Sequence, residues 1–217
     1  MSTARTLILL GDSILDNAPY TGSAPDTTHH LRQQLGASWT VDLLARDGAV
    51  MSDVRFQLAQ LPERVDCAIL SIGGNDALGH IDLLERRASS ATQLFGALAD
   101  IADRFAASYL QVTKAVAART ARLVLCTIYE PPLFDPTTAR LARVPLGVLN
   151  DRIVQVASCL SLDVLDLRSV CTETSDFVQQ IEPSARGAAK IASAIAELVR
   201  GSRELSAARV IASPLRG

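Results

Sequence analysis

The stretch of sequence that decides the fold reads Thr6-Leu7-Ile8-Leu9-Leu10-Gly11-Asp12-Ser13, a strand-length run that ends in a glycine, an acid and a serine. A second run, residues 67–72, ends in a similar way, in Gly73-Gly74-Asn75-Asp76. Continuous apolar runs of this length are typical of strands buried on both faces of a parallel sheet. We therefore predict two parallel strands whose carboxyl ends carry polar, glycine-rich turns.

Three more runs of this kind occur along the chain, and helix-like segments separate all five. This alternation predicts a three-layer, flavodoxin-like α/β fold with about five parallel strands and right-handed crossovers. The further runs span residues 40–45, 122–128 and 163–167, and the helix-like segments span residues 26–35, 52–61, 89–118, 144–160 and 184–200. Ser52 and Pro62 bracket one predicted helix, and Ser184 and Gly201 bracket the last one.

The chain is predicted to form one domain over residues 1–201, followed by an extension over residues 202–217. Its 217 residues are 48% hydrophobic, which is enough to bury a core without disulfides or metal ions. Residues 131–145 contain several prolines and are expected to form a long loop beside the ligand-binding edge. The size of any pocket would depend on this loop and on residues 17–25 and 79–88.

Composition and charge exclude several classes of function. The formal net charge of −2 gives no electrostatic reason for a nucleic-acid partner. None of the four cysteines forms a C-x-x-C pair, so we expect reduced thiols. No run approaches the roughly 18 apolar residues of a membrane span, and the first run is too short for a signal peptide. We therefore expect a cytoplasmic protein with no membrane partner, and the sequence does not indicate an oligomeric state.

The two turns carry residues suited to acyl-ester chemistry. Ligands of such sheets bind at the carboxyl ends of the strands, so Ser13 and Asn75 are expected to share one edge. Ser13 is a candidate nucleophile, and the Asn75 amide is a candidate donor to an oxyanion. Each has a simpler interpretation: Ser13 as a helix cap and Asn75 as part of an Asx turn. Asp12 could likewise only tie its loop to backbone N–H groups.

Taken together, the turns resemble the SGNH/GDSL hydrolase family. That family carries a serine in Gly-Asp-Ser, an asparagine in Gly-x-Asn-Asp and an Asp-x-x-His near its end, and here the first two motifs occur in that order. The segment from Pro183 to Ala192 also resembles the family's His-Pro-x-x-x-Gly ending. The resemblance covers residues 6–200. It implies a serine esterase or lipase-like hydrolase that acts on a small carboxylic ester without a cofactor or metal ion.

The second loop of the family pattern is altered in this chain. Ser52 stands where the family has a glycine, although Gly48 is a weaker alternative by spacing. A backbone N–H survives that change, so the resemblance implies an oxyanion hole formed by the N–H groups of Ser13 and Ser52 and by the Asn75 amide. The simpler interpretation of Ser52 is the N-cap of its helix.

The catalytic histidine of the family is absent. Glu182 precedes Pro183 where the histidine belongs, and Gln179 replaces the aspartate three residues earlier. We expect Glu182 to act as the general base, with its pKa raised by burial or by a neighbouring acid such as Asp176. A carboxylate has no tautomer to fix, so the loss of both residues is coherent. His80 and His30 are alternative bases.

Four further residues are predicted to line the substrate site: Asp12, Gly74, His80 and Glu130. Three functions stay open at this level. The protein hydrolyses a small ester, binds such a ligand without turnover, or transfers the acyl group to an alcohol. The acids and amides at this edge, such as Asp12, Asp16 and Asn75, have no metal-ligand spacing, so no metal site is predicted.

Overall fold

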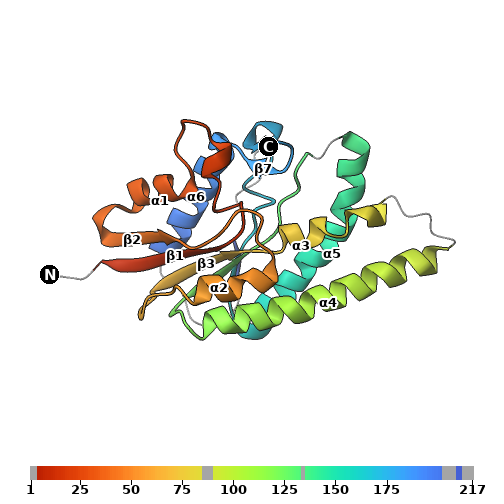
Figure 1. The fold of residues 1–217 in the computed structure, drawn as a ribbon, viewed down its shortest axis with the longest axis horizontal. Coiled ribbons are helices and arrows are strands. Elements are labelled where there is room, and N and C mark those ends of the chain that lie inside the picture. Colours follow the sequence, from red (N-terminus) through yellow and green to blue (C-terminus); the bar gives the residue numbers. More distant parts are fainter. Residues whose placement is uncertain (1–3, 85–89, 133–134, 202–208, 212–217) are drawn as a thin grey trace.

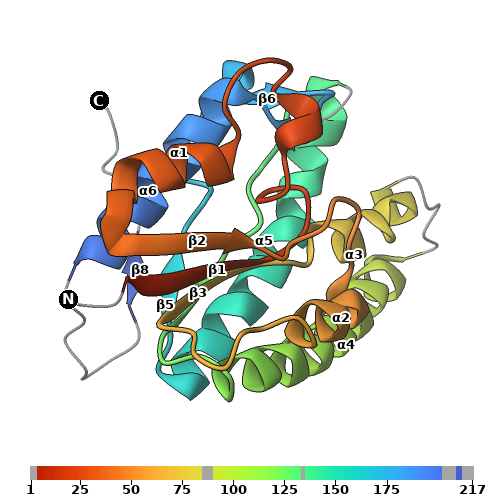
Figure 2. The ribbon, with the colours of Figure 1, turned by 60° about the vertical axis from the view of Figure 1, so that its left-hand side comes forward.

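A computed structural model describes residues 4–84, 90–132, 135–201 and 209–211. Its centre is a six-stranded parallel sheet in the order β2-β1-β3-β4-β5-β8 (Figures 1 and 2). The strands are β1 (Arg5–Gly11), β2 (Trp39–Leu43), β3 (Cys67–Ser71), β4 (Leu123–Cys126), β5 (Asp163–Leu165) and β8 (Val210–Ile211). The three-layer α/β fold predicted from the sequence is confirmed.

Helices cover both faces of this sheet. Helices α1 (Thr27–Leu35) and α6 (Ala185–Arg200) pack together on one face (Figure 2). The other face is covered by α2 (Val54–Leu58), α4 (Ala91–Ala117) and α5 (Pro136–Leu160). Shorter elements lie in the connections: η1 (Ala18–Tyr20), η2 (Gly36–Ser38), η3 (Met51–Asp53), α3 (Gly74–Leu78), η4 (Ile81–Leu84), η5 (Thr174–Asp176), and the hairpin of β6 (Phe177–Val178) and β7 (Glu182–Pro183).

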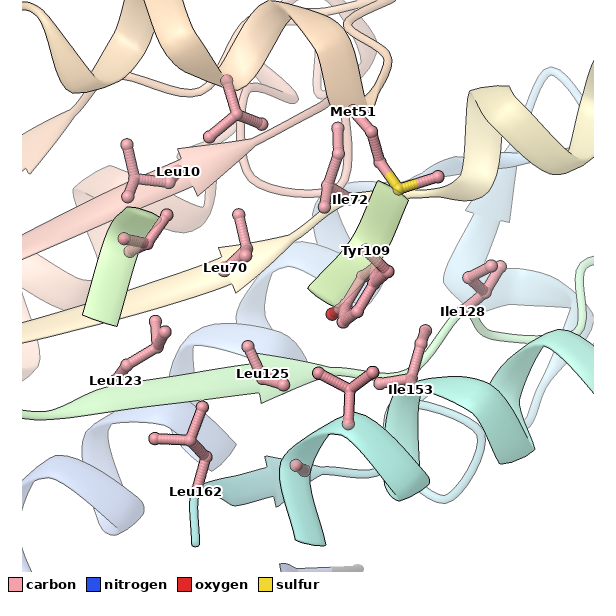
Figure 3. Close-up of a cluster of buried hydrophobic side chains, with 14 of the residues drawn as sticks. Leu10, Met51, Leu70, Ile72, Tyr109, Leu123, Leu125, Ile128, Ile153 and Leu162 are labelled. Atoms are coloured by element: carbon pink, nitrogen blue, oxygen red, sulfur yellow. The ribbon is translucent and has the colours of Figure 1, made fainter. Parts of the chain in front are cut away.

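Strand β1 explains why its sequence is continuously apolar. Leu7 and Leu9 face the layer of α1 and α6, whereas Ile8 and Leu10 face the layer of α4 and α5. Figure 3 shows this second cluster, in which strand residues meet side chains of α4 and α5: Leu10, Leu70, Leu125, Tyr109 and Ile153. Because alternate residues enter two different cores, none of them is left for solvent.

The sixth strand comes from the segment that we predicted as an extension. Val210 and Ile211 pair with Val164 and Leu165, and the Arg209 guanidinium binds the Asp163 carboxylate at 3.0 and 3.1 Å. A two-residue strand carries too little pattern to be recognised in a sequence. The rest of that extension, residues 202–208 and 212–217, lies outside the described residues.

The predicted loop over residues 131–145 is wrong for most of its length. Helix α5 begins at Pro136, because the Asp135 carboxylate accepts the N–H groups of Thr137 and Thr138 at 2.8 and 3.0 Å. Pro136 itself stands at the first helical position, where a missing N–H costs nothing. Pro145, which we interpreted as a helix boundary, lies inside the helix.

The predicted helix over residues 52–61 is also shorter than expected. Helix α2 spans only Val54–Leu58, and Ser52 belongs to the short turn η3 before it. Val50 rather than Ser52 precedes that turn, and the Asp53 carboxylate accepts the Val50 N–H at 3.0 Å. The interpretation of Ser52 as a helix N-cap is therefore wrong.

Gly11 brings the two polar turns into contact. Its φ is 126°, and a Cβ placed there would lie 1.7 Å from the Ser71 carbonyl oxygen at the end of β3. Only glycine permits this approach. The Gln57 side chain closes the arrangement, since it accepts the Gly11 N–H and donates to the Gly11 carbonyl, both at 2.8 Å. The residues that follow Gly11 are thereby held beside the end of β3.

Candidate active site

Ser13 lies in the tight turn after β1 and is 7% exposed. The N–H groups of Leu15 and Asp16 both bond to the Asp12 carbonyl at 3.1 Å, and the Asp12 side chain accepts the Ile14 N–H at 3.2 Å. These bonds close the turn around the serine. Ser13 is thus held at the carboxyl edge of the sheet, as the sequence predicts, with its side chain in a nearly dry environment.

Glu182 reaches the same place from the opposite end of the chain. It is 9% exposed and stands in β7 of the β6–β7 hairpin. The Ser13 hydroxyl lies near enough to the Glu182 carboxylate to lower its pKa, and one carboxylate oxygen of Glu182, Oε2, is buried without a hydrogen-bond partner among the described residues. The hairpin is positioned by Tyr129, whose hydroxyl donates to the Ile181 carbonyl at 2.5 Å and whose ring meets the edge of Phe177. The sequence-predicted pair of Ser13 and Glu182 is therefore brought together in the lining of one pocket.

The surroundings of Glu182 raise its pKa above the ordinary value. Burial is the largest cause of the rise, the Ser13 hydroxyl acts in the opposite direction, and the nearby Asp47 carboxylate adds to the rise. The acid that we named from the sequence, Asp176, is not among these causes. Asp176 is buried and neutralised by Lys190 at 2.6 Å and Arg186 at 3.3 Å. A raised pKa makes Glu182 a better proton acceptor than an exposed glutamate.

Asn75 lies on the other side of the site, at the start of α3. The chain enters this helix through Gly73, which has a φ of 113°. The Asn75 Nδ2 donates to the Ala49 carbonyl at 2.9 Å, which fixes the direction of the amide. An amide nitrogen carries two hydrogens, so the second one can serve a ligand. The Asp76 carboxylate accepts the Met51 N–H at 3.1 Å and ties the same two loops together.

Only some of the other predicted site residues line the pocket. Gly74 lines the pocket beside Asp12, and His80 lines it with an exposed side chain. Ser52 is exposed in η3 and is not among the described residues that line the pocket. His30 lies on α1, away from the lining residues.

Two further positions named from the sequence lie off the pocket lining. Glu130 forms an ion pair with Arg143 at 3.1 Å. It is not among the described residues that line the pocket. Gln179 occupies the exposed turn of the β6–β7 hairpin with a φ of 47°. It therefore does not orient Glu182 in the way that the family aspartate would orient a histidine.

The pocket beside Ser13 has a cavity volume of about 100 Å³ and opens to solvent. Asp12, Ser13, Asn75 and Glu182 form its polar end, and the rest of its wall is almost entirely apolar. The apolar wall comes from α3, η4, α4 and α5: Ala77, Leu78, Ile81, Leu83, Leu84, Leu98, Ile101, Ala142, Pro145, Leu146 and Leu149. Sequence reasoning missed this wall, although Leu98 with Ile101 and Leu146 with Leu149 stand at helical spacing in the sequence.

This arrangement matches a known family at the level of sequence and of fold. The sequence profile of the GDSL-like Lipase/Acylhydrolase family matches residues 9–211. The chain belongs to this family. No curated protein sequence matches the chain. This GDSL hydrolase shares its fold with lipases and esterases of known structure, and the family membership confirms the resemblance inferred from its motifs.

Three of those solved structures illustrate the range of the fold. An extracellular lipase from Streptomyces rimosus is 17% identical with a TM-score of 0.66, over 89% of this chain and 99% of its own. Phospholipase A1 from Streptomyces albidoflavus NA297 is 18% identical with a TM-score of 0.66, over the same shares. A variant of an acetyl xylan esterase from Geobacillus stearothermophilus is 16% identical with a TM-score of 0.65, over 92% and 96%.

Two negative findings concern the described residues of this GDSL hydrolase. They contain no cluster of three or more histidine, cysteine, aspartate or glutamate side chains placed to hold a metal ion. Among them there is also no helix with the length and apolarity needed to cross a bilayer.

Asp12 is the second buried acid of the site in this GDSL hydrolase. It is 1% exposed, and burial raises its pKa to about 8, with a further contribution from the Glu182 carboxylate. The bond from the Ile14 N–H opposes this rise but does not cancel it. Asp12 is therefore largely protonated at neutral pH, so that one uncharged and one ionisable carboxyl flank Ser13.

This protonation predicts a pH-dependent stability. The folded protein holds the Asp12 proton more tightly than the unfolded chain, where aspartate titrates near pH 3.9. The stabilisation is complete below that pH and is lost as the pH rises through about 8. The free energy of unfolding, measured with urea, should therefore fall less between about pH 5 and about pH 9 in Asp12→Asn than in the wild type. Asp26→Asn, which changes an exposed acid and keeps a helix cap, is the matched control. Equal losses in all three proteins would contradict a neutral Asp12.

Proposed function

We propose that this GDSL hydrolase cleaves carboxylic esters whose acyl part is an apolar chain. The observation that carries the proposal is the proximity of the Ser13 hydroxyl and the buried Glu182 carboxylate in the lining of an otherwise apolar pocket. The pair supplies a nucleophile and its base, and the pocket supplies a place for the acyl chain. This extends the expectation from the sequence, which was a small acyl group.

In the first step, the Ser13 Oγ attacks the ester carbonyl carbon while Glu182 takes the hydroxyl proton. The negative charge that develops on the carbonyl oxygen is stabilised by the Asn75 amide and by the backbone N–H of Ser13, the two predicted donors whose residues line the pocket. The protonated Glu182 then gives its proton to the leaving alcohol, which leaves an acyl-serine. A water molecule repeats the sequence, with Glu182 as base, and releases the carboxylic acid.

The comparisons support the chemistry without specifying the substrate. The family is one of lipases and acylhydrolases, and the similar structures include a lipase, a phospholipase and an acetyl xylan esterase. An acetyl group needs little space, whereas the pocket of this chain is walled by eleven apolar residues from α3, η4, α4 and α5. Within that range of activities, the wall favours a substrate with a longer acyl chain.

A chain-length series of p-nitrophenyl esters tests the proposal. Each methylene moved from water into an apolar site is worth about 0.8 kcal/mol, so kcat/KM should rise at least about tenfold from the acetate to the octanoate. Ala142→Phe, which adds a ring to the wall, should remove most of this preference and leave acetate turnover nearly unchanged. Ala139→Phe, three residues earlier on α5 and outside the pocket lining, is the control. Absence of turnover with every ester would indicate a binding protein, and product esters formed only with added alcohol would indicate an acyltransferase.

A further inference from the structure

Most of the exposed large apolar side chains among the described residues lie on elements that form the pocket wall. Seven large hydrophobic side chains among the described residues are substantially exposed, and five of them belong to η4, α4 and α5. These five form what we call the rim: Ile81 (38% exposed), Leu94 (37%), Phe95 (62%), Leu141 (41%) and Val144 (59%). A concentration of this kind is unusual for a solvated surface and marks an interaction site.

The rim is continuous with the pocket wall. Ile81 itself lines the pocket, and Leu94 stands one helical turn before the lining residue Leu98. Leu141 and Val144 adjoin the lining residues Ala142 and Pro145 on α5. A chain that leaves the pocket would therefore pass directly over the rim.

Charge is distributed in an equally uneven way. Residues 90–99, which include the first turns of α4, carry no charged side chain, and residues 90–96 are all exposed. In Figure 1 these turns project past the end of the sheet toward which the parallel strands run. On α5, the charged residues between Asp135 and Asp151 are Arg140 and Arg143 only. Arg143 is paired with Glu130, and Asp82 stands beside Ile81 in η4. Arg140 is therefore the basic side chain that this exposed apolar surface offers to an interface rich in phosphate groups.

We propose that the rim binds the surface of a phospholipid bilayer or micelle, with the pocket mouth facing the lipid. The exposed apolar side chains enter the boundary between headgroups and acyl chains, and Arg140 lies at the level of the phosphates. The choice of a lipid surface over a second copy of this chain rests on the proposed function, because a protein seated on the rim would close the mouth to its substrate. This contact is peripheral. It revises the expectation of no membrane partner without requiring a helix that spans the membrane.

The test measures binding in a protein that cannot hydrolyse the lipid. Ser13→Ala protein is mixed with vesicles of phosphatidylcholine and phosphatidylglycerol and is separated by sedimentation. We expect this protein to pellet with the vesicles, and the further double variant Phe95→Gln with Val144→Gln to show at least about tenfold weaker partitioning. Phe56→Gln changes a side chain of the same kind, 57% exposed on α2 and outside the rim, and should bind like the parent.

The outcomes separate this inference from the proposed function. In the Ser13-containing protein, the double variant should keep its kcat/KM for a soluble short-chain ester, because neither residue lines the pocket. If the protein hydrolyses soluble esters but does not pellet with vesicles, the lipid contact proposed for the rim is wrong and the proposed function still holds. Vesicle binding without hydrolysis of any ester would support the rim and contradict the proposed function. A parent that is dimeric, fails to pellet, and becomes monomeric in the double variant would show that a second copy occupies the rim instead.

Discussion

Ser13→Ala is expected to lower kcat for p-nitrophenyl octanoate by about 10⁶-fold, which is the scale seen when a serine nucleophile is removed from a hydrolase. The reason is that no acyl-enzyme can form without the Oγ, whereas the pocket and the oxyanion donors are unchanged. The urea unfolding midpoint should stay close to that of the wild type, because only one partly shielded oxygen is lost. Steady-state kinetics at saturating ester, with an uncatalysed blank, measure the effect.

Two controls keep this result interpretable. Ser38→Ala changes an exposed serine in η2 and should retain full activity. A fluorophosphonate, which reacts with activated serines, should add one label to the wild type at Ser13 and none to Ser13→Ala, as read by peptide mass spectrometry. Turnover in Ser13→Ala close to that of the wild type would show that the chemistry lies elsewhere in the protein.

The parts of the fold that sequence reasoning identified are those in which one physical requirement dominates. Residues 6–10 must be apolar on both faces because alternate side chains enter two different cores. Gly11 must be glycine because the Ser71 carbonyl occupies the space of a side chain. Such requirements leave strong local patterns. The two-residue strand β8 leaves none, because its position depends on pairing with β5 and on the ion pair between Arg209 and Asp163.

Competing local signals explain the error at α5. Pro145 favours a helix boundary on its own, since proline lacks an N–H and its ring crowds the preceding turn. The signal that decides the start of the helix is Asp135 followed by Pro136, which together cap and begin the first turn. The remaining packing of this 25-residue helix outweighs the cost of one interior proline.

The residues of the candidate site could be predicted where they belong to motifs that occur in a fixed order along the sequence. Ser13, Asn75 and Glu182 follow strands or precede a helix in a family pattern, and all three line one pocket. The acid that influences Glu182 was not predictable in this way. Asp47 is distant in sequence and acts through space, whereas Asp176, close in sequence, is neutralised by Lys190. The apolar wall was missed for the same reason, because it exists only once separate helices are placed side by side.

The proposed role of Glu182 as base, in the place of the family's histidine, changes how the base is tuned. An imidazole needs a partner that fixes its tautomer, whereas a carboxylate needs an environment that raises its affinity for a proton. In this protein the burial of Glu182 and the nearby Asp47 carboxylate provide that environment. Gln179, which stands at the position of the family's aspartate, lies in an exposed turn. The pH dependence of catalysis should therefore report a carboxylate whose pKa lies above the ordinary value.

Glu182→Gln is the variant that tests this base most directly. The amide keeps the shape of the side chain but cannot accept the Ser13 proton, so kcat should fall by about 10²–10⁴-fold. In the wild type, kcat/KM should rise as the pH increases through the raised pKa of Glu182 and then level off, because only the ionised form is a base. This rise should disappear in Glu182→Gln. Stopped assays across the acidic and neutral range measure both effects.

Asp47→Asn supplies the matched control for the pH profile. Removing the Asp47 charge takes away one cause of the raised pKa, so the rise in kcat/KM should move to lower pH while the plateau stays within a few-fold of the wild type. The Asp47 carboxylate also accepts the Tyr20 hydroxyl at 2.7 Å, and Tyr20→Phe separates the loss of that bond from the loss of the charge. A Glu182→Gln enzyme with the rate and pH profile of the wild type would remove Glu182 from the mechanism. His80, the one histidine among the described lining residues of the pocket, would then be the next base to test.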